Sequence, residues 1–428
     1  MSEIKSIVSL LSFLLQAIVS ILIIWLSNHL IDPNYTSYIV YTLAIGGLFT
    51  LADFGLKTIY QRVYAVDKND AKGLLNIFVL LLLIYSFIGL ILEYLFEVNS
   101  MNVISFIFRT FFYFRMIEYL SNGRIIKEKI FRIIAVILNI LLFYATLKTS
   151  YYSHALFFGN LVYFFLSIRI PKEKIHFRIL KQIFFKYFDS IRDYMKNLVP
   201  AYFLIPLPLL LIKGFVDDSN YISLGYLYQI LQGATAFSTI PTIALVSSYA
   251  KLPFGDSYIN LIRLNQSVSI RLFVYSFIGG IILFSNYIDG FSSPFIWIIL
   301  IGVFGILESY QKVWMYSKIQ KGIMGYPKVF ILSVLLQLFL LYLLREMYPS
   351  LVIVLAILVQ MFIVDIYLIN REGFKHSSVL FYPLLFLLVL GINNSIVEVM
   401  ILILVMFLCF LDLKKFYENL NNYPGQSS

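Results

Sequence analysis

Long apolar runs recur along the whole of this 428-residue chain. A helix needs roughly 17–25 mostly apolar residues to cross a bilayer core about 30 Å thick. About fourteen runs approach this length, near residues 6–29, 36–56, 74–97, 102–121, 133–148, 151–168, 197–216, 222–250, 272–287, 295–315, 329–345, 350–369, 378–393 and 396–413. They lack the period-two alternation of barrel strands, and 60% of all residues are hydrophobic, more than a soluble domain carries. The sequence therefore predicts an all-α polytopic membrane protein.

Basic residues fall mainly in alternate connections between these runs. Of the 33 Lys and Arg residues, the exceptions are Arg109, Arg115, Lys148, Lys213 and Arg345. Cytoplasmic loops of membrane proteins are enriched in Lys and Arg, so the pattern predicts that both termini are cytoplasmic. The net charge of +10 follows from this topology, and we do not read it as a sign of nucleic-acid binding.

Two segments of similar sequence suggest that the chain contains an internal repeat. "LIDPNYTSYIVYTLAIGG" follows the first span, and "FVDDSNYISLGYLYQILQG" follows the seventh. The shared residues are Asn34, Tyr35 and Gly47 in the first segment and Asn220, Tyr221 and Gly233 in the second. Six spans in each half place the halves in the same orientation. We therefore expect two six-helix lobes related by a pseudo-two-fold axis along the membrane normal, an arrangement found in transporters.

The longest connection lies between these halves and has apolar residues at helical spacing, with basic residues mainly on the other face. This pattern predicts a helix in the inner membrane interface, facing anionic headgroups; a partner-binding helix is the alternative. The predicted divisions are an N-lobe at 1–170, this linker at 171–196, a C-lobe at 197–370, two additional spans at 371–413 and a cytoplasmic tail at 414–428.

Several polar residues lie inside the apolar runs, where lipid cannot satisfy them. Gln16 is in span one, Asp53 in span two, and Gln229 and Gln232 in span eight. We expect the glutamines to face a water-filled cavity between the lobes. Asp53 is predicted either to anchor an inner gate or to lie in interfacial water at a helix end. The single cysteine and the four histidines lie in separate segments, so no metal or cofactor site is expected.

Span four, "ISFIFRTFFYFRMIEYL", carries three charges within an apolar run. Arg115 and Glu118 are three residues apart near its cytoplasmic end, where they can pair and reach water. Arg109 lies too deep for that. It must face a cavity or an acid on another helix, with Glu308 and Asp365 as candidates. An arginine at such a depth suits an anionic ligand with planar acceptors such as phosphate.

The segment "LADFGLKTIYQR" matches a recurring Asp-x-Gly-Leu pattern followed by Arg, at Asp53, Gly55, Leu56 and Arg62. With the outer turn "LIDPNYTSYIVYTLA" and the basic middle linker, the chain resembles the O-antigen and polysaccharide-repeat flippases. These belong to the multidrug/oligosaccharidyl-lipid/polysaccharide exporter superfamily. The resemblance implies that an undecaprenyl-pyrophosphate-linked oligosaccharide is moved across the bacterial inner membrane by alternating access. It also implies a cationic cavity with Arg109 nearby. The expected partners are this substrate, membrane lipids and the polysaccharide polymerase and chain-length machinery.

Two alternatives stay open. A multidrug exporter of the same superfamily would carry lipophilic cations and would rely on buried acids. A membrane glycan polymerase would need a large outer loop, whereas the outer connections here are short. We therefore do not expect the chain to be an enzyme.

Overall fold

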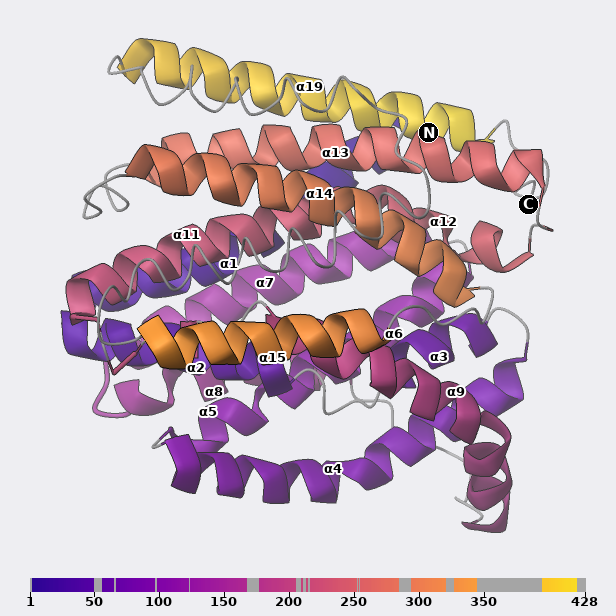
Figure 1. Ribbon diagram of the computed structural model, residues 1–428, viewed down its shortest axis with the longest axis horizontal. Helices are drawn as coiled ribbons and strands as arrows, with labels where there is room; N and C mark the ends of the chain where they lie inside the picture. The colour runs from indigo at the N-terminus through magenta and orange to yellow at the C-terminus, as the bar shows by residue number, and fades with distance from the viewer. Residues whose placement is uncertain are drawn as a thin grey trace. The chain divides into compact units, whose positions relative to one another are not determined.

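The structure is a computed structural model of the chain. It describes residues 2–49, 56–64, 67–96, 98–122, 124–167, 177–204, 209–210, 213–214, 216–251, 253, 255–284, 294–320, 327–344 and 395–421. Every secondary-structure element in these ranges is helical (Figure 1). This confirms the predicted all-α fold. Four of the described helices contain stretches long and apolar enough to cross a membrane: Ile7–Leu30, Ile126–Leu147, Asp256–Phe284 and Ser395–Asn419.

Contacts between Cα atoms divide the chain into two compact units, which we describe separately. The N-unit comprises Leu22–Pro206, and the C-unit comprises Met1–Ile21 together with Leu207–Ser428. Helix α1 (Ser2–Leu30) therefore contributes residues to both units. The lobe boundaries and the cytoplasmic position of the termini stay predictions.

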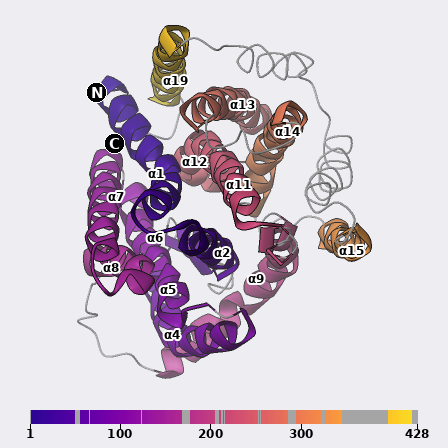
Figure 2. The same cartoon turned by 90° about the vertical axis from the view of Figure 1, so that its left-hand side faces the viewer.

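The helices of the N-unit are α2 (Pro33–Phe49), α3 (Leu56–Tyr64), α4 (Lys68–Phe96), α5 (Ser100–Ile104), α6 (Phe106–Ser121), α7 (Ile125–Leu147), α8 (Ala155–Ser167) and α9 (Phe177–Leu204), with a 3-10 turn, η2, at Tyr152–His154. In this bundle α6, α7 and α8 pack against one another, and α4 packs against α3, α5 and α9. Figure 2 shows α6, α7 and α8 end-on, side by side. Aromatic rings fill much of this core; the ring of Phe114, for example, contacts those of Tyr60 and Phe78.

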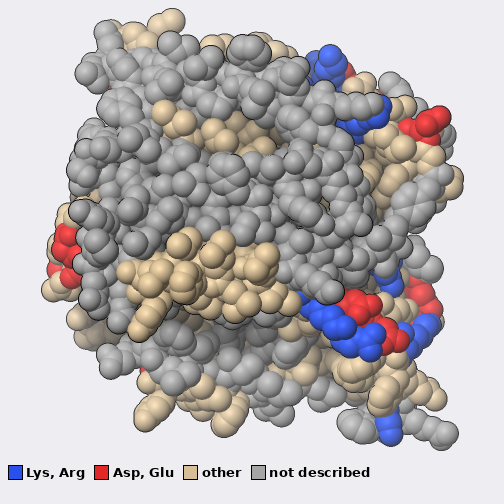
Figure 3. Space-filling model, in the orientation of Figure 1, with Lys and Arg blue, Asp and Glu red and all other residues tan. Residues whose placement is uncertain are grey.

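Helix α9 includes most of the predicted linker and continues into the first residues predicted for span seven. One side of α9 packs on α4, where Ile183 approaches Gly73 so closely that a Cβ there would clash. Tyr187 Oη donates a hydrogen bond of 2.7 Å to Asp70 Oδ2, and Lys186 also pairs with that carboxylate. The hydrogen bond from Lys186 lowers the pKa of Asp70. Charged side chains gather over α9 in Figure 3, so this helix has an apolar side toward α4 and a charged exposed side.

The helices of the C-unit are α11 (Asp218–Ser238), α12 (Ile240–Lys251), α13 (Asp256–Phe284), α14 (Pro294–Gln320), α15 (Pro327–Leu344) and α19 (Ser395–Asn421), together with the first part of α1. They are arranged around α13, which packs against α11, α14 and α19. Ser9 Oγ lies 3.0 Å from Tyr417 Oη and joins α1 to α19. Helices α13 and α14 pack closely at Gly305, where an added Cβ would lie 1.9 Å from Phe273 Cζ.

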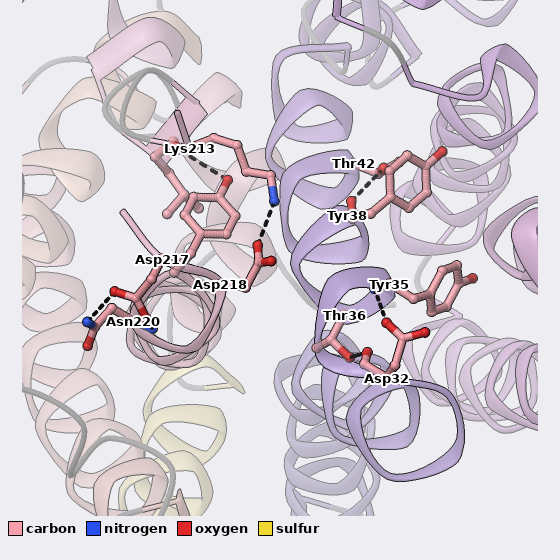
Figure 4. Close-up of polar contacts among 11 residues, drawn as sticks. Asp32, Tyr35, Thr36, Tyr38, Thr42, Lys213, Asp217, Asp218 and Asn220 are labelled. Atoms are coloured by element: carbon pink, nitrogen blue, oxygen red, sulfur yellow. Dashed lines mark hydrogen bonds and ion pairs between the residues drawn. The ribbon is translucent and has the colours of Figure 1, made fainter. Parts of the chain in front are cut away.

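The two segments of similar sequence have the same local structure, each within its own unit (Figure 4). Asp32 Oδ1 accepts a hydrogen bond of 2.7 Å from Tyr35 N at the start of α2. Asp217 Oδ2 accepts one of 3.1 Å from Asn220 N at the start of α11. Each aspartate thus satisfies a backbone N–H that the first turn of a helix leaves unpaired. Hydrogen bonds from Asn220 lower the pKa of Asp217.

The shared tyrosines also act alike. Tyr35 Oη donates to the backbone oxygen of Tyr152 at 2.6 Å, and Tyr221 Oη donates to that of Leu209 at 3.1 Å. Both side chains are buried. Both segments therefore have a helix start capped by an aspartate, displaced by one residue relative to the shared Asn and Tyr, and a tyrosine hydrogen bond to a neighbouring segment.

Candidate functional site

Arg109 is held between α6 and α8 in the N-unit. Its Nε donates a hydrogen bond of 2.9 Å to Asn160 Oδ1, and its guanidinium lies over the rings of Phe106 and Tyr163, at 5.3 and 5.5 Å. The buried Nη2 atom has no hydrogen-bond partner. No acid pairs with Arg109 among the described residues of the N-unit. Of the two candidate acids, Glu308 belongs to the C-unit and Asp365 lies outside the described residues, so both partnerships stay predictions. Arg109 is instead positioned by an amide and two aromatic faces.

Asn160 belongs to a longer chain of buried polar groups. It accepts from Asn139 Nδ2 of α7 at 3.2 Å and donates to Ser105 Oγ at 2.8 Å. Ser105 Oγ donates to the backbone oxygen of Asn102, and Asn102 Nδ2 donates to that of Ser153, at 2.6 and 2.7 Å. These contacts join α5, α6, α7 and α8 to the 3-10 turn η2.

A buried charged cluster occupies the beginning of α7. Glu128 is fully buried, and Lys129 and Arg132 are 3% and 6% exposed. Arg132 Nε pairs with Glu128 Oε1, and Lys129 Nζ lies 3.0 Å from Glu128 Oε2, an ion pair outside hydrogen-bond geometry. The Arg132 guanidinium also lies 5.0 Å from the centre of the Tyr113 ring on α6.

Sequence reasoning missed this cluster, because it assigned these basic residues to a solvated connection. One signal was available. Glu128, Arg132 and Asn139 follow helical spacing and share one face of α7, so the helical pattern could have been extended back through the charges.

Arg115 and Glu118 form the ion pair expected from their spacing. Arg115 Nη1 lies 2.5 Å from Glu118 Oε2, and both side chains are mostly buried. Tyr60 Oη of α3 donates to Glu118 Oε1 at 3.2 Å. The pair therefore also links α3 to α6, a contact that the spacing alone did not predict.

In the C-unit, α11 and α14 bring together a second set of polar groups. Glu308 Oε1 pairs with Lys312 Nζ at 2.8 Å, one helical turn away. The other oxygen, Oε2, is buried and has no hydrogen-bond partner. Gln232 is exposed, and its Nε2 donates to Tyr228 Oη at 2.7 Å. Gln229 is 4% exposed. The structure thus places Gln229, Gln232 and Glu308 on adjoining helices of one unit.

The other predicted site residues are Gln16, Asp53 and Asp365. Gln16 donates from Nε2 to Ser12 Oγ at 3.1 Å and to the Ser12 backbone oxygen at 3.2 Å, within its own helix. Asp53 and Asp365 lie outside the described residues. The described part of the chain contains no group of His, Cys, Asp and Glu suited to a metal ion.

The fold of the chain is similar to that of a solved helical membrane protein. A solved structure of the MATE multidrug transporter DinF-BH matches this chain with a TM-score of 0.59. The match covers 86% of this chain and 94% of that one, at 12% sequence identity. No known protein family and no curated protein matches the sequence. At this sequence identity the match shows a shared fold, and the family of the chain stays a prediction.

Proposed function

We propose that this protein is a multi-pass membrane exporter that moves a lipid-linked oligosaccharide, carried on undecaprenyl pyrophosphate, across the bacterial inner membrane. The transporter fold supports export in general. Arg109 carries the assignment of the substrate. Its guanidinium has a buried Nη2 atom without a partner, and no carboxylate pairs with it in the described part of the chain. A diphosphate oxygen would satisfy that donor and supply the missing charge.

The test compares a gene deletion with complementation by Arg109 variants. Deletion should cause lipid-linked repeat units to accumulate in the inner leaflet. Arg109→Ala should fail to restore surface glycan at equal membrane abundance. Arg109→Lys should restore it poorly, because an ammonium cannot present the two parallel, coplanar N–H donors of a guanidinium. Normal glycan export by Arg109→Ala would remove the support for a phosphate-bearing substrate.

A multidrug exporter is the second candidate, and a different observation favours it. Glu308 offers a buried carboxylate oxygen without a hydrogen-bond partner, near Tyr228 of α11, whose hydroxyl accepts from Gln232. A buried acid suits a lipophilic cation. This function predicts that deletion raises susceptibility to lipophilic cationic dyes, that Glu308→Gln abolishes their efflux, and that lipid-linked repeat units do not accumulate.

A further inference from the structure

Helix α9 has apolar side chains on two sides, of which one is buried in the N-unit. Ile183 and Ile191 are buried, and Ile183 lies against Gly73 of α4. Phe185 and Phe188, in contrast, are 64% and 42% exposed. The side of this helix that the sequence assigns to the membrane interface is therefore partly covered by protein, whereas these two phenylalanines are not.

The exposed phenylalanines alternate with basic residues along one face of α9. We call this set the α9 stripe: Lys181, Phe185, Phe188, Arg192 and Lys196. Successive members are three or four residues apart, which places them on one side of a helix, and all five are exposed. The Phe184 ring lies 5.9 Å from that of Phe185 and 5.6 Å from that of Phe188. The apolar part of the stripe is thus a cluster of aromatic rings, and exposed apolar clusters mark sites of interaction.

The linker that contains the stripe has an excess of positive charge. Residues 171–196 include seven Lys and Arg residues against three Asp and Glu residues, and charged side chains gather over α9 in Figure 3. Arg192 pairs with Asp189 at 3.0 Å, but Lys196 lies 4.0 Å from Asp193, and Lys181 has no ion pair with another described residue. The charge of this surface therefore suits an anionic partner.

Contacts with α4 place the stripe close to the beginning of a predicted membrane span. Ile183 lies against Gly73, and Lys186 and Tyr187 bind the carboxylate of Asp70. Both α4 residues directly precede the apolar run at 74–97. A helix rises 1.5 Å per residue, so Asp70 lies about 6 Å along α4 from the start of that run. This part of α9 is consequently at the level where lipid headgroups meet acyl chains.

We infer that the α9 stripe binds anionic phospholipid of the cytoplasmic leaflet. Phe185 and Phe188 enter the boundary between headgroups and acyl chains, as aromatic residues of interfacial helices do. The basic residues of the stripe attract the headgroup phosphates. A partner protein fits the stripe less well, because protein interfaces are depleted in lysine and two of the three cations are lysines. The contact does not depend on which substrate is transported.

Photo-crosslinking of the full-length chain in bacterial membranes identifies what the stripe touches. p-Benzoylphenylalanine replaces Phe185 in one variant and Phe188 in another. The control carries it at Leu141, which is 55% exposed in the middle of the candidate span Ile126–Leu147 and should sample the bulk lipids. We expect phospholipid adducts at both stripe positions, with a higher ratio of phosphatidylglycerol to phosphatidylethanolamine than at Leu141. Adducts to another polypeptide, an absence of adducts at both positions, or the same lipid ratio as at Leu141 would overturn the inference.

The basic residues are tested in the variant that carries the photoreactive group at Phe185. One basic residue near an anionic membrane surface contributes about a fivefold preference. Lys181→Gln together with Lys196→Gln should therefore lower the lipid ratio about fivefold or more. The matched control, Lys181→Arg together with Lys196→Arg, retains both charges and should retain the ratio. Equal ratios in the two double variants, measured on protein recovered from the membrane, would overturn the inference. Neither experiment involves a transported substrate, so failure of the proposed function is a separate result.

Discussion

Removing Lys312 should harm the C-unit far more than removing its partner Glu308, because the two side chains differ in exposure. That of Glu308 is 5% exposed and that of Lys312 is 33% exposed. In Lys312→Met the buried carboxylate has lost its cation, and leaving a buried charge without its partner costs about 3–5 kcal/mol. In Glu308→Gln the lysine can reach water along its flexible stem, at a cost of about 1 kcal/mol or less.

Apparent melting temperatures of the purified single and double variants provide the assay. The double variant should recover most of the loss, because it leaves neither charge unpaired. Equal losses in the two single variants, or a double variant as unstable as Lys312→Met, would refute the reasoning.

Three further predictions follow from other contacts. Gly305→Ala should lower the free energy of unfolding by about 1–3 kcal/mol through overpacking. Gly279→Ala should leave the stability unchanged or raise it, because the nearest side-chain atom is 3.7 Å from an added Cβ. Thermal unfolding of the two variants measures both effects. Lys186 lowers the pKa of Asp70, so the attachment of α9 to α4 should be present above about pH 4 and lost as the pH falls further. Asp70→Asn should loosen the attachment at neutral pH. Distances between spin labels on the two helices would measure both effects. Arg115→Lys should retain near-normal abundance and export, since a lysine can also pair with an acid three residues along the helix. Loss of export at normal abundance would contradict this.

Some features of this protein depend only on the order of its residues. The apolar runs require helices, because a backbone in lipid must satisfy its own hydrogen bonds within the segment. The pairing of Arg115 with Glu118 and the aspartates that begin α2 and α11 are also local, since their partners lie three residues along the chain. Such features were predictable from spacing.

Tertiary packing decided the surroundings of the other charged residues. Arg109 is bound by Asn160, 51 residues away, a partner that the spacing within its own helix does not indicate. Hydropathy assigned Glu128, Lys129 and Arg132 to a solvated connection, yet all three are buried. Helices α6 and α8 pack against α7, and the Arg132 guanidinium lies over the Tyr113 ring of α6. A linear pattern records which residues share a helix face, but the energy of burying a charge depends on what the neighbouring helices place opposite it.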